Sequence, residues 1–259
     1  MEHLMEMPVV AFVVCLALLW VSAQVGAYIR RLWKDREEIL HQDLDVVLGA
    51  ALTLLALIVG FTLSMAVGRY DQRKNYEEEE ANAIGTEYLR VGLLPAPDAA
   101  KEQELLRSYL EQRILFYTTH DLDKLEQIDA ATARLQNDLW SALQAPATAQ
   151  PTPVMATIIT GMNDVLNRQG YTQAAWWYRI PVGAWALMLI VAICCNLLVG
   201  FNTKASKGRA RLFFVLPLII SIAFFLIADI DSPRRGVIQV SPHNLISLSQ
   251  SLSGPQTLH

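Results

Sequence analysis

The sequence contains few of the residues that usually build chemical sites. Of its 259 residues only three are cysteine, and none of these lies in a polar segment. A disulfide framework is therefore excluded, and a thiolate metal site is disfavoured. The five histidines are scattered without a pair at i, i+4 spacing, and no nucleophile elbow or phosphate-binding glycine loop occurs. We expect no enzyme, no bound metal and no cofactor.

Charged residues are absent from four long apolar runs. A helix rises about 1.5 Å per residue, so roughly 20 apolar residues cross the hydrocarbon layer of a membrane. A soluble domain rarely buries four such helices that have no charge on any face. The sequence therefore predicts an all-α, multi-pass membrane protein with four transmembrane helices: Pro8–Ile29, Val46–Val67, Ile180–Phe201 and Leu212–Ala228.

Polar residues gather between the second and third runs. Residues 69–179 contain 11 Lys and Arg and 16 Asp and Glu, and this acidic balance gives no electrostatic reason to bind nucleic acid. We expect a helical extramembrane domain inserted between spans two and three. Residues 1–68 are predicted to contain spans one and two with a basic loop, and residues 69–179 an extended helix plus a bundle. Residues 180–230 should contain spans three and four, and residues 231–259 a polar C-terminal tail.

Basic residues are unevenly distributed among the short loops. Residues 30–36 and 204–211 each carry four Lys or Arg, whereas Met1–Met7 carries two Glu and no basic residue. Lys and Arg concentrate in cytoplasmic loops, so both basic loops are expected in the cytoplasm. The N-terminus and the central domain would then lie outside it. The acidic start also differs from the basic first region of a cleaved signal peptide.

Small residues recur along one face of the second apolar run. Their spacing of three or four residues places them on successive turns of a helix, and such faces let membrane helices approach closely. We consider two roles. The face packs against a helix, within the subunit or between subunits, or it lines a pore in which Thr53, Thr62 and Ser64 offer hydroxyl groups. This small-residue face consists of Gly49, Thr53, Ala56, Gly60, Ser64 and Gly68.

The helical pattern of the second run continues beyond its apolar residues. Good helix formers follow without proline, so the second span should project as one continuous helix to about Leu89. Four consecutive glutamates on this extension occupy different sides of it, so a single chain cannot chelate one cation with all four. We expect a solvated charged face, or an acidic ring at a pore mouth if copies surround an axis. The ring consists of Glu77, Glu78, Glu79 and Glu80.

Three further apolar stripes predict a helical bundle together with this extension. Pro95–Pro97 should end the long helix, and Asp98 is expected to cap the next one. A solvated turn at residues 118–121 should cap the following helix. A linker is expected at Ala145–Pro153, and Gly170 should end the last helix of the bundle.

Four strings extend this description. They are IVGFTLSMA at Ile58–Ala66, RYD at Arg69–Asp71, EANAIGTEYLR at Glu80–Arg90 and DSPRRG at Asp231–Gly236. Together they resemble the bacterial bestrophin-like family, long catalogued as a domain of unknown function. The likeness covers most of the chain, and its glutamate-initiated EANAIGT string is fairly specific.

This resemblance implies a protein of the bacterial inner membrane and suggests kinship with bestrophins, which are pentameric anion channels. Bestrophins keep both termini and most of their soluble mass in the cytoplasm, opposite to the orientation that the loop charges predict. We expect a homo-oligomer in the lipid bilayer, an ion channel whose second span lines or braces a conduit for small ions. The alternative is a non-conducting sensor or scaffold whose exported helical domain binds a partner.

Charged residues flank the second and fourth spans at ends that share one level. Both spans run in the same direction, so opposite charges there meet at a partly dry boundary. We expect these residues to act structurally, with Arg69 paired to Asp231 or Asp71 to Arg234, unless each is solvated among the headgroups. These membrane-boundary charges are Arg69, Asp71, Asp231, Arg234 and Arg235.

Overall fold

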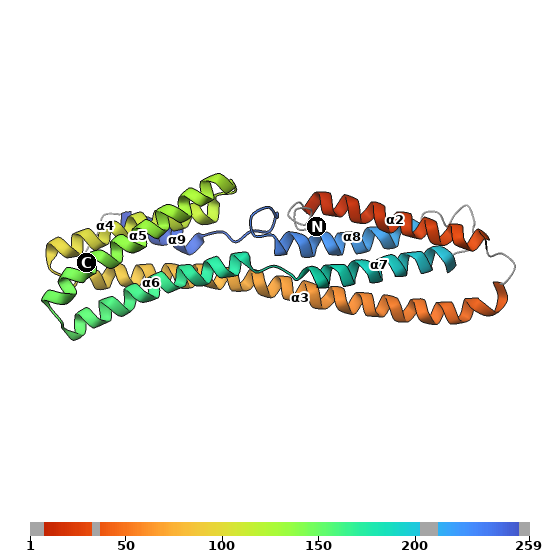
Figure 1. Cartoon of the computed structure of the whole chain (residues 1–259), viewed down its shortest axis with the longest axis horizontal. Coiled ribbons are helices and arrows are strands. Elements are labelled where there is room, and N and C mark those ends of the chain that lie inside the picture. Colours follow the sequence, from red (N-terminus) through yellow and green to blue (C-terminus); the bar gives the residue numbers. More distant parts are fainter. Residues whose placement is uncertain (1–7, 33–36, 203–211, 254–259) are drawn as a thin grey trace. The chain divides into compact units, whose positions relative to one another are not determined.

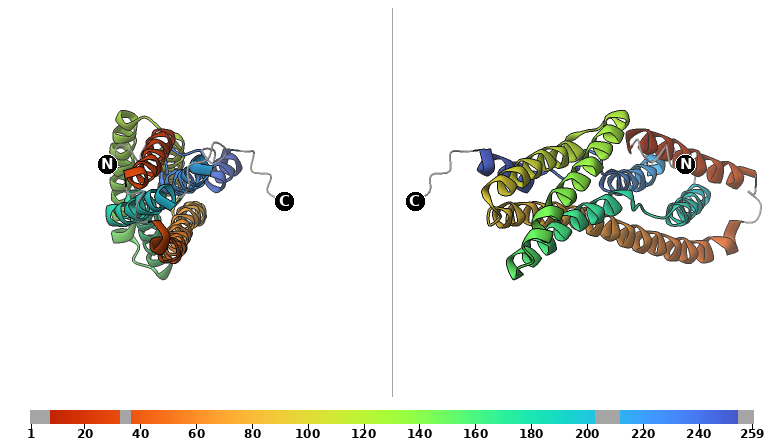
Figure 2. Two further views of the ribbon diagram at one scale, coloured as in Figure 1. Left: turned by 90° about the vertical axis from the view of Figure 1, so that its right-hand side faces the viewer. Right: turned by 60° about the vertical axis from the view of Figure 1, so that its left-hand side comes forward.

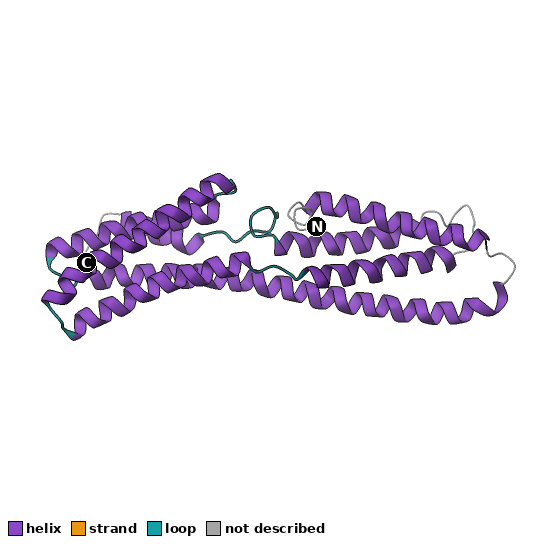
Figure 3. Cartoon of the chain, viewed as in Figure 1, coloured by secondary structure: helices purple, strands orange, loops and turns teal. Residues whose placement is uncertain are grey.

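The computed structural model describes residues 8–32, 37–202 and 212–253, and every regular element in these ranges is a helix (Figures 1 and 3). The all-α class is therefore confirmed. In chain order the helices are α2 (Pro8–Leu32), α3 (Glu37–Val91), α4 (Ala96–Thr118), α5 (Leu122–Ala149), α6 (Pro153–Trp177), α7 (Val182–Asn202), α8 (Leu212–Asp231) and α9 (His243–Ser253).

Four helical segments of the described chain are long and apolar enough to cross a membrane. Each of them overlaps one of the four charge-free runs almost completely, so the expectation of four apolar helices is confirmed. Of the basic loops that were used to predict orientation, Arg30 and Arg31 lie in the last turn of α2, whereas residues 33–36 and 204–211 lie outside the described residues. The segments are Val9–Leu32, Leu44–Val91, Pro153–Asn202 and Phe213–Asp231.

The chain forms two compact units, each built from pieces that are distant in sequence. The first unit contains Met1–Tyr70 and Arg179–Gln239, and the second contains Asp71–Tyr178 and Val240–His259. Helix α3 is continuous over 55 residues and contributes to both units. The predicted extension of the second span as one helix is therefore confirmed, and the helix ends at Val91.

Within the first unit, α2 packs along α7 and α8 (Figures 1 and 2). The backbones of α2 and α7 approach closely at two glycines. A Cβ at Gly26 would overlap the carbonyl oxygen of Leu197, and a Cβ at Gly200 would overlap that of Ala23. Residues without side chains permit this kind of helix contact in membranes. The sequence analysis did not predict these two glycines as a packing site.

The second unit contains the polar part of α3 together with α4, α5, α6 and α9. Helix α4 packs along α5 and also contacts α9. The apolar stripes predicted for these helices supply their buried side chains, because residues at i, i+3 and i+4 share one face. The buried residues include Ile84, Leu106, Leu110, Leu139, Leu143, Ile158, Met162 and Val165.

Helix boundaries in the second unit agree with the sequence analysis at one end and differ at others. Asp121 caps α5, its carboxylate accepting hydrogen bonds from the backbone N–H groups of Asp123 at 3.0 Å and Lys124 at 3.5 Å. The expected cap at Asp98 is wrong, since Pro95 occupies the N-cap of α4 and Asp98 lies in its first turn. An acidic residue there still favours the helix through the dipole.

Two predicted helix ends are also wrong. Helix α5 continues through Pro146 to Ala149, and α6 continues through Gly170 to Trp177. A proline removes one backbone donor, and a glycine costs a helix about 1 kcal/mol relative to alanine. Burial outweighs these local costs, because Pro146 is itself buried and Ala175 and Trp176 are buried beyond the glycine.

The C-terminal segment contains structure that the sequence analysis treated as a polar tail. Residues His243–Ser253 form helix α9, whose Leu245 is completely buried in the second unit. Leu248 of the same helix lies against Gly85 of α3, where a Cβ would stand 3.0 Å from a leucine methyl group. A single apolar face is therefore enough to dock this short helix.

Candidate functional site

The small-residue face of α3 is exposed along its whole length. All six of its residues are exposed in the structure, and a Cβ added at Gly49, Gly60 or Gly68 would meet no atom within 4 Å. Leu55, Thr62 and Ala66, on the other side of α3, are buried in the core of the first unit. One side of the apolar part of α3 is thus buried, and the small-residue face is exposed together with large apolar side chains such as Leu54, Leu57 and Phe61.

This arrangement corrects two parts of the sequence analysis. Packing of the small-residue face within the subunit is wrong for the described chain, because no other helix covers it. Thr62 does not belong with Thr53 and Ser64, since it is only 4% exposed and its hydroxyl donates to the carbonyl of Ile58 at 2.7 Å. Thr53 donates similarly to Gly49 at 2.8 Å, but its side chain remains exposed.

Arg69 and Asp231 form an ion pair at the end of the apolar part of α3. Nη1 of Arg69 lies 3.8 Å from Oδ1 of Asp231, so this pairing predicted from the sequence is present. Asp231 also accepts hydrogen bonds from the backbone N–H of Ile180, at 3.3 and 3.1 Å, and Arg179 donates to its carbonyl oxygen at 2.5 Å. Asp231 therefore links the end of α8 to both α3 and the chain entering α7.

The loop after α8 is held by Asp229, a residue that the sequence analysis did not single out. Its carboxylate accepts hydrogen bonds from the backbone N–H groups of Val237 at 2.7 Å and Ile238 at 2.9 Å. Gly236 makes this turn possible, because a Cβ there would overlap the carbonyl oxygen of Asp229. These contacts explain the final glycine of the DSPRRG string as a packing requirement. Only the position of Gly236, eight residues after the last apolar run, would have indicated this from sequence.

The remaining boundary charges differ in exposure. Arg234 is half-buried, whereas Asp71 and Arg235 are exposed. Asp71 belongs to the second unit and Arg234 to the first, and a pairing between them stays a prediction.

The four glutamates of the acidic ring have different environments. Glu78 is exposed and Glu79 is partly exposed, with an ion pair to Arg168 of α6 at 2.5 Å. Glu77 and Glu80 are 1% and 0% exposed, so the expectation of a solvated face is wrong for these two. They face the neighbouring helices of the second unit, which the sequence pattern alone could not reveal.

Glu77 caps helix α9 from the side of α3. Its Oε1 accepts hydrogen bonds from the backbone N–H groups of Asn244 at 2.9 Å and Leu245 at 3.0 Å, and Oε2 accepts one from the side chain of Asn244 at 2.6 Å. The first N–H groups of a helix lack partners within the helix, and their partial positive charge attracts a carboxylate. Glu77 therefore fixes the position of α9.

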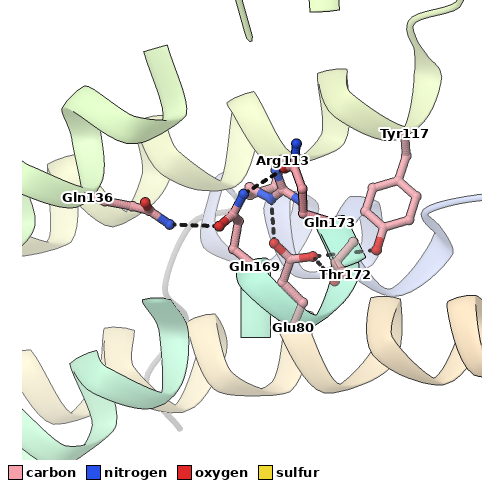
Figure 4. Close-up of polar contacts among 7 residues, drawn as sticks. All are labelled: Glu80, Arg113, Tyr117, Gln136, Gln169, Thr172 and Gln173. Carbon is pink, nitrogen blue, oxygen red and sulfur yellow. Dashed lines mark hydrogen bonds and ion pairs between the residues drawn. The ribbon is translucent and has the colours of Figure 1, made fainter. Parts of the chain in front are cut away.

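Glu80 lies at the centre of a buried polar cluster between α3, α4 and α6 (Figure 4). It accepts a hydrogen bond from Nε of Arg113, and further ones from Thr172 at 3.1 Å and Tyr117 at 3.4 Å. Burial, with the charge of Glu80 as a smaller cause, raises the pKa of Tyr117 above its usual range. The phenol therefore stays protonated and acts as a donor to Glu80.

A row of glutamines extends this cluster toward α5 (Figure 4). Gln136 donates to Gln169 at 3.3 Å, and Gln169 donates to Gln173 at 2.9 Å. The Glu80 group joins α3, α4 and α6 by side-chain hydrogen bonds, and the glutamine row joins α5 to α6; neither contains a nucleophile beside a general base. Within the residues that the structure describes, no three His, Cys, Asp or Glu are grouped so that they could hold a metal.

Comparisons with known proteins agree with one another. The model of the bestrophin-like domain matches residues 9–245. The fold resembles that of a bacterial bestrophin homolog from Klebsiella pneumoniae, in one mutant structure with a TM-score of 0.66 and 13% identity over 93% of this chain and 97% of the other. A second mutant structure of that homolog has a TM-score of 0.64 and 12% sequence identity, over 93% of this chain and 97% of the other.

A structure described only as a mutant membrane protein is equally similar, with a TM-score of 0.64 and 11% identity over 95% of this chain and 98% of that one. No curated protein matches the sequence. At these identities the solved structures establish a shared fold. The family model extends over most of the residues, from α2 into α9, and the chain therefore belongs to the bestrophin-like family.

Proposed function

We propose that this protein is a homo-oligomeric ion channel in which the small-residue face of α3 lines or braces the conduit. The observation that carries the proposal is the exposure of this face in the single chain. A Cβ added at Gly49, Gly60 or Gly68 would meet no atom within 4 Å, while the opposite side of α3 is buried. Another copy of the chain, water in a conduit or lipid can cover such a face, and the proposal assigns it to the first two.

The chemistry of the face suits both parts of this role. Glycine, alanine and serine let helices from neighbouring subunits approach one another. The exposed hydroxyl groups of Thr53 and Ser64 offer hydrogen bonds to water or to an ion in a narrow passage. Membership of the bestrophin-like family and the fold shared with a bacterial bestrophin homolog support the same assignment.

The proposal includes the arrangement of the chain in the membrane. The first unit lies in the lipid bilayer, since it contains the charge-free parts of α2, α3, α7 and α8. The second unit is the extramembrane helical domain, because the charged part of α3 and the helices α4 to α6 belong to it. From the loop charges we place the N-terminus and this domain outside the cytoplasm of a bacterial inner membrane.

Conductance measurements with matched cysteine variants test the proposal. Thr53 and Leu54 lie at the same depth and about 100° apart around α3, and both are exposed. After the three native cysteines are removed, Thr53→Cys and Leu54→Cys variants are reconstituted in planar bilayers and treated with a charged thiol reagent. We expect ion currents that the reagent blocks in the Thr53 variant and leaves unchanged in the Leu54 variant.

Two results would contradict the proposal. Absence of currents from folded, reconstituted protein would favour the alternative of a sensor or scaffold whose helical domain binds a partner. Equal sensitivity of the two variants would remove the small-residue face from the conduit. A symmetry-resolved structure of the purified oligomer would then show which helix surrounds the axis.

A further inference from the structure

Glu87 and Glu102 are two buried carboxylates of the second unit, and the charge of Glu87 acts on Glu102. Glu87 is in the last turns of α3 and Glu102 is in the second turn of α4. A tight turn joins the helices, with the N–H groups of Leu93 and Leu94 bonded to the carbonyls of Arg90 and Val91 at 2.9 and 3.1 Å. The side chains of the two glutamates are 0% and 1% exposed.

Neither buried carboxylate has a close hydrogen-bond donor, although Glu87 forms an ion pair with Arg90 at 3.6 Å. No oxygen of Glu87 or Glu102 accepts a hydrogen bond from the described residues. Glu77 and Glu80 are buried equally well, yet each accepts hydrogen bonds from three donors. Burial of an ionised carboxylate without such donors is strongly unfavourable. The contrast shows that Glu77 and Glu80 occupy sites built for a negative charge, whereas Glu87 and Glu102 do not.

The third helix around this pair supplies no donor. Gly161 of α6 lies directly against Glu87, because a Cβ at this position would overlap Oε2 of the carboxylate. The glycine makes room for the Glu87 carboxyl group and for the neighbouring Arg90 guanidinium, and it contributes no polar side chain. Burial of the carboxyl group at this contact favours its neutral form.

The charged groups around the pair are unbalanced. Arg90 of α3 lies 3.6 Å from Glu87, and its side chain is 35% exposed, so water screens it. Asp164 of α6 is the other charged group acting on Glu87, and Asp98 and Lys101 of α4 act on Glu102. Each of these two cations is thus matched by an acidic neighbour, and neither neutralises the two buried glutamates.

The protonation behaviour follows from these surroundings. Burial raises the pKa of Glu87 to about 7, partly opposed by Arg90, and raises the pKa of Glu102 to about 7, partly opposed by Lys101. Glu87 lies some 20 residues, or about 30 Å of helix, beyond Val67, the last residue of the charge-free run of α3, and so outside the membrane-spanning part. Because the charge of Glu87 also raises the pKa of Glu102, the two titrate as a coupled pair.

We propose that Glu87 and Glu102 form a proton-binding site that makes the packing of α3, α4 and α6 in the second unit dependent on pH. At low pH both carboxyl groups are neutral, and the buried pair fits its dry surroundings. As the pH rises through neutrality, the pair loses its protons and places negative charge between the three helices. The inference is independent of ion conduction, since it concerns a site in the second unit alone.

The sign of the effect on stability is determined by the direction of the shifts. In the unfolded chain both groups titrate near the ordinary value of 4.5. The folded protein therefore binds more protons between about pH 4.5 and pH 7, and stability falls as the pH rises through this window. Above about pH 7 the stability contributed by the protonated pair is completely lost, and below about pH 4.5 that contribution is constant.

Thermal unfolding of the full-length protein in detergent tests the site between pH 5 and pH 8, with tryptophan fluorescence as the readout. We expect the Glu102→Gln variant to have the melting temperature of wild type at pH 5. At pH 8 its melting temperature should be roughly 5 °C higher than that of wild type, because the amide cannot ionise. Glu111→Gln is the matched control, since Glu111 is exposed on the same helix. This control should keep the pH dependence of wild type.

A second measurement detects the proton directly. The infrared band of a neutral carboxylic acid should persist in wild type at pH 6 and decrease in the Glu102→Gln variant. The Glu87→Gln variant should show the same decrease, and it replaces Glu102→Gln in this test if that variant does not fold. The proposal would be overturned if wild type and the folded variant had equal melting temperatures at every pH. It would also be overturned if wild type showed no infrared band of a neutral carboxylic acid. Stabilisation of wild type but not Glu102→Gln by Ca²⁺ or Mg²⁺ at pH 8 would also overturn it, in favour of a cation site.

Discussion

Glu80 and Arg113 form an ion pair that is enclosed completely in the second unit, with both side chains 0% exposed. The two residues stand 33 positions apart in the sequence and connect α3 to α4. Thr172 and Tyr117 satisfy the carboxylate further. Such a pair is costly to disrupt, because removing one member leaves an uncompensated buried charge.

We therefore expect Arg113→Met to destabilise the protein by about 3–5 kcal/mol, seen as a drop of roughly 10 °C in the melting temperature of the detergent-purified protein. Replacing both residues, as in Glu80→Leu with Arg113→Met, should recover part of this loss. Arg134→Met, at an exposed position of α5, is the control and should change little. A double variant as unstable as the sum of its single changes would show that the pair is not coupled.

Asp231→Ala should destabilise the protein more than Arg69→Ala. The ion pair between them is partly exposed and lacks a short hydrogen bond, so Arg69→Ala should cost less than about 1 kcal/mol. Asp231 also accepts the buried N–H of Ile180, and loss of that acceptor should add about 1–3 kcal/mol. Asp231→Asn retains an acceptor for the N–H of Ile180, so its melting temperature should lie between those of Asp231→Ala and Arg69→Ala. Equal losses for the two alanine variants would mean that the ion pair dominates.

Gly60→Leu should weaken the oligomer. A leucine on the small-residue face would separate helices that meet there and remove their dispersion contacts. Gly183→Leu is the control, because Gly183 of α7 is also exposed with nothing within 4 Å of a Cβ. Light scattering coupled to size-exclusion chromatography measures the oligomer in detergent. If Gly60→Leu and Gly183→Leu both assembled as wild type does, the small-residue face would be in contact with lipid and not with another subunit.

Gly200→Ala should destabilise the first unit, because its Cβ would overlap the carbonyl oxygen of Ala23 on α2. Overpacking of this kind costs about 1–3 kcal/mol. Gly170→Ala provides the opposite case, since a Cβ there meets nothing within 4 Å inside α6, and alanine favours a helix by up to about 1 kcal/mol. Melting temperatures should therefore move in opposite directions. A Gly200→Ala variant as stable as wild type would show that α2 and α7 can separate without loss.

Single cysteines at Arg36 and Thr148 test the proposed orientation after the native three cysteines are removed. Thr148 is exposed near the end of α5, and Arg36 lies in the first basic loop. The loop charges predict that an impermeant thiol reagent labels position 148 and not position 36 on intact cells. The reverse pattern would place the second unit in the cytoplasm, as in bestrophins.

The acidic string on α3 shows where sequence reasoning stopped. Four successive glutamates indicate only that they point to different sides of a helix. Whether each side meets water depends on residues far along the chain: the partners of Glu80 and Glu77 include Thr172 and Asn244, 92 and 167 positions away. The small-residue face shows the same limit, since its pattern was visible but its exposure required knowing which helices cover α3.

The amino-acid sequence by itself determined the helical class, the four apolar helices and the continuity of α3 through Leu89, and it offered the pairing of Arg69 with Asp231 as one of two alternatives. These properties depend on local composition and on the direction of consecutive spans. Tertiary structure alone decided that Gly26 and Gly200 bring α2 and α7 together, that α9 docks beside Glu77, and that Glu87 and Glu102 are buried without donors. The reason is physical, because burial and hydrogen bonding are properties of residues that folding brings together from distant parts of the chain.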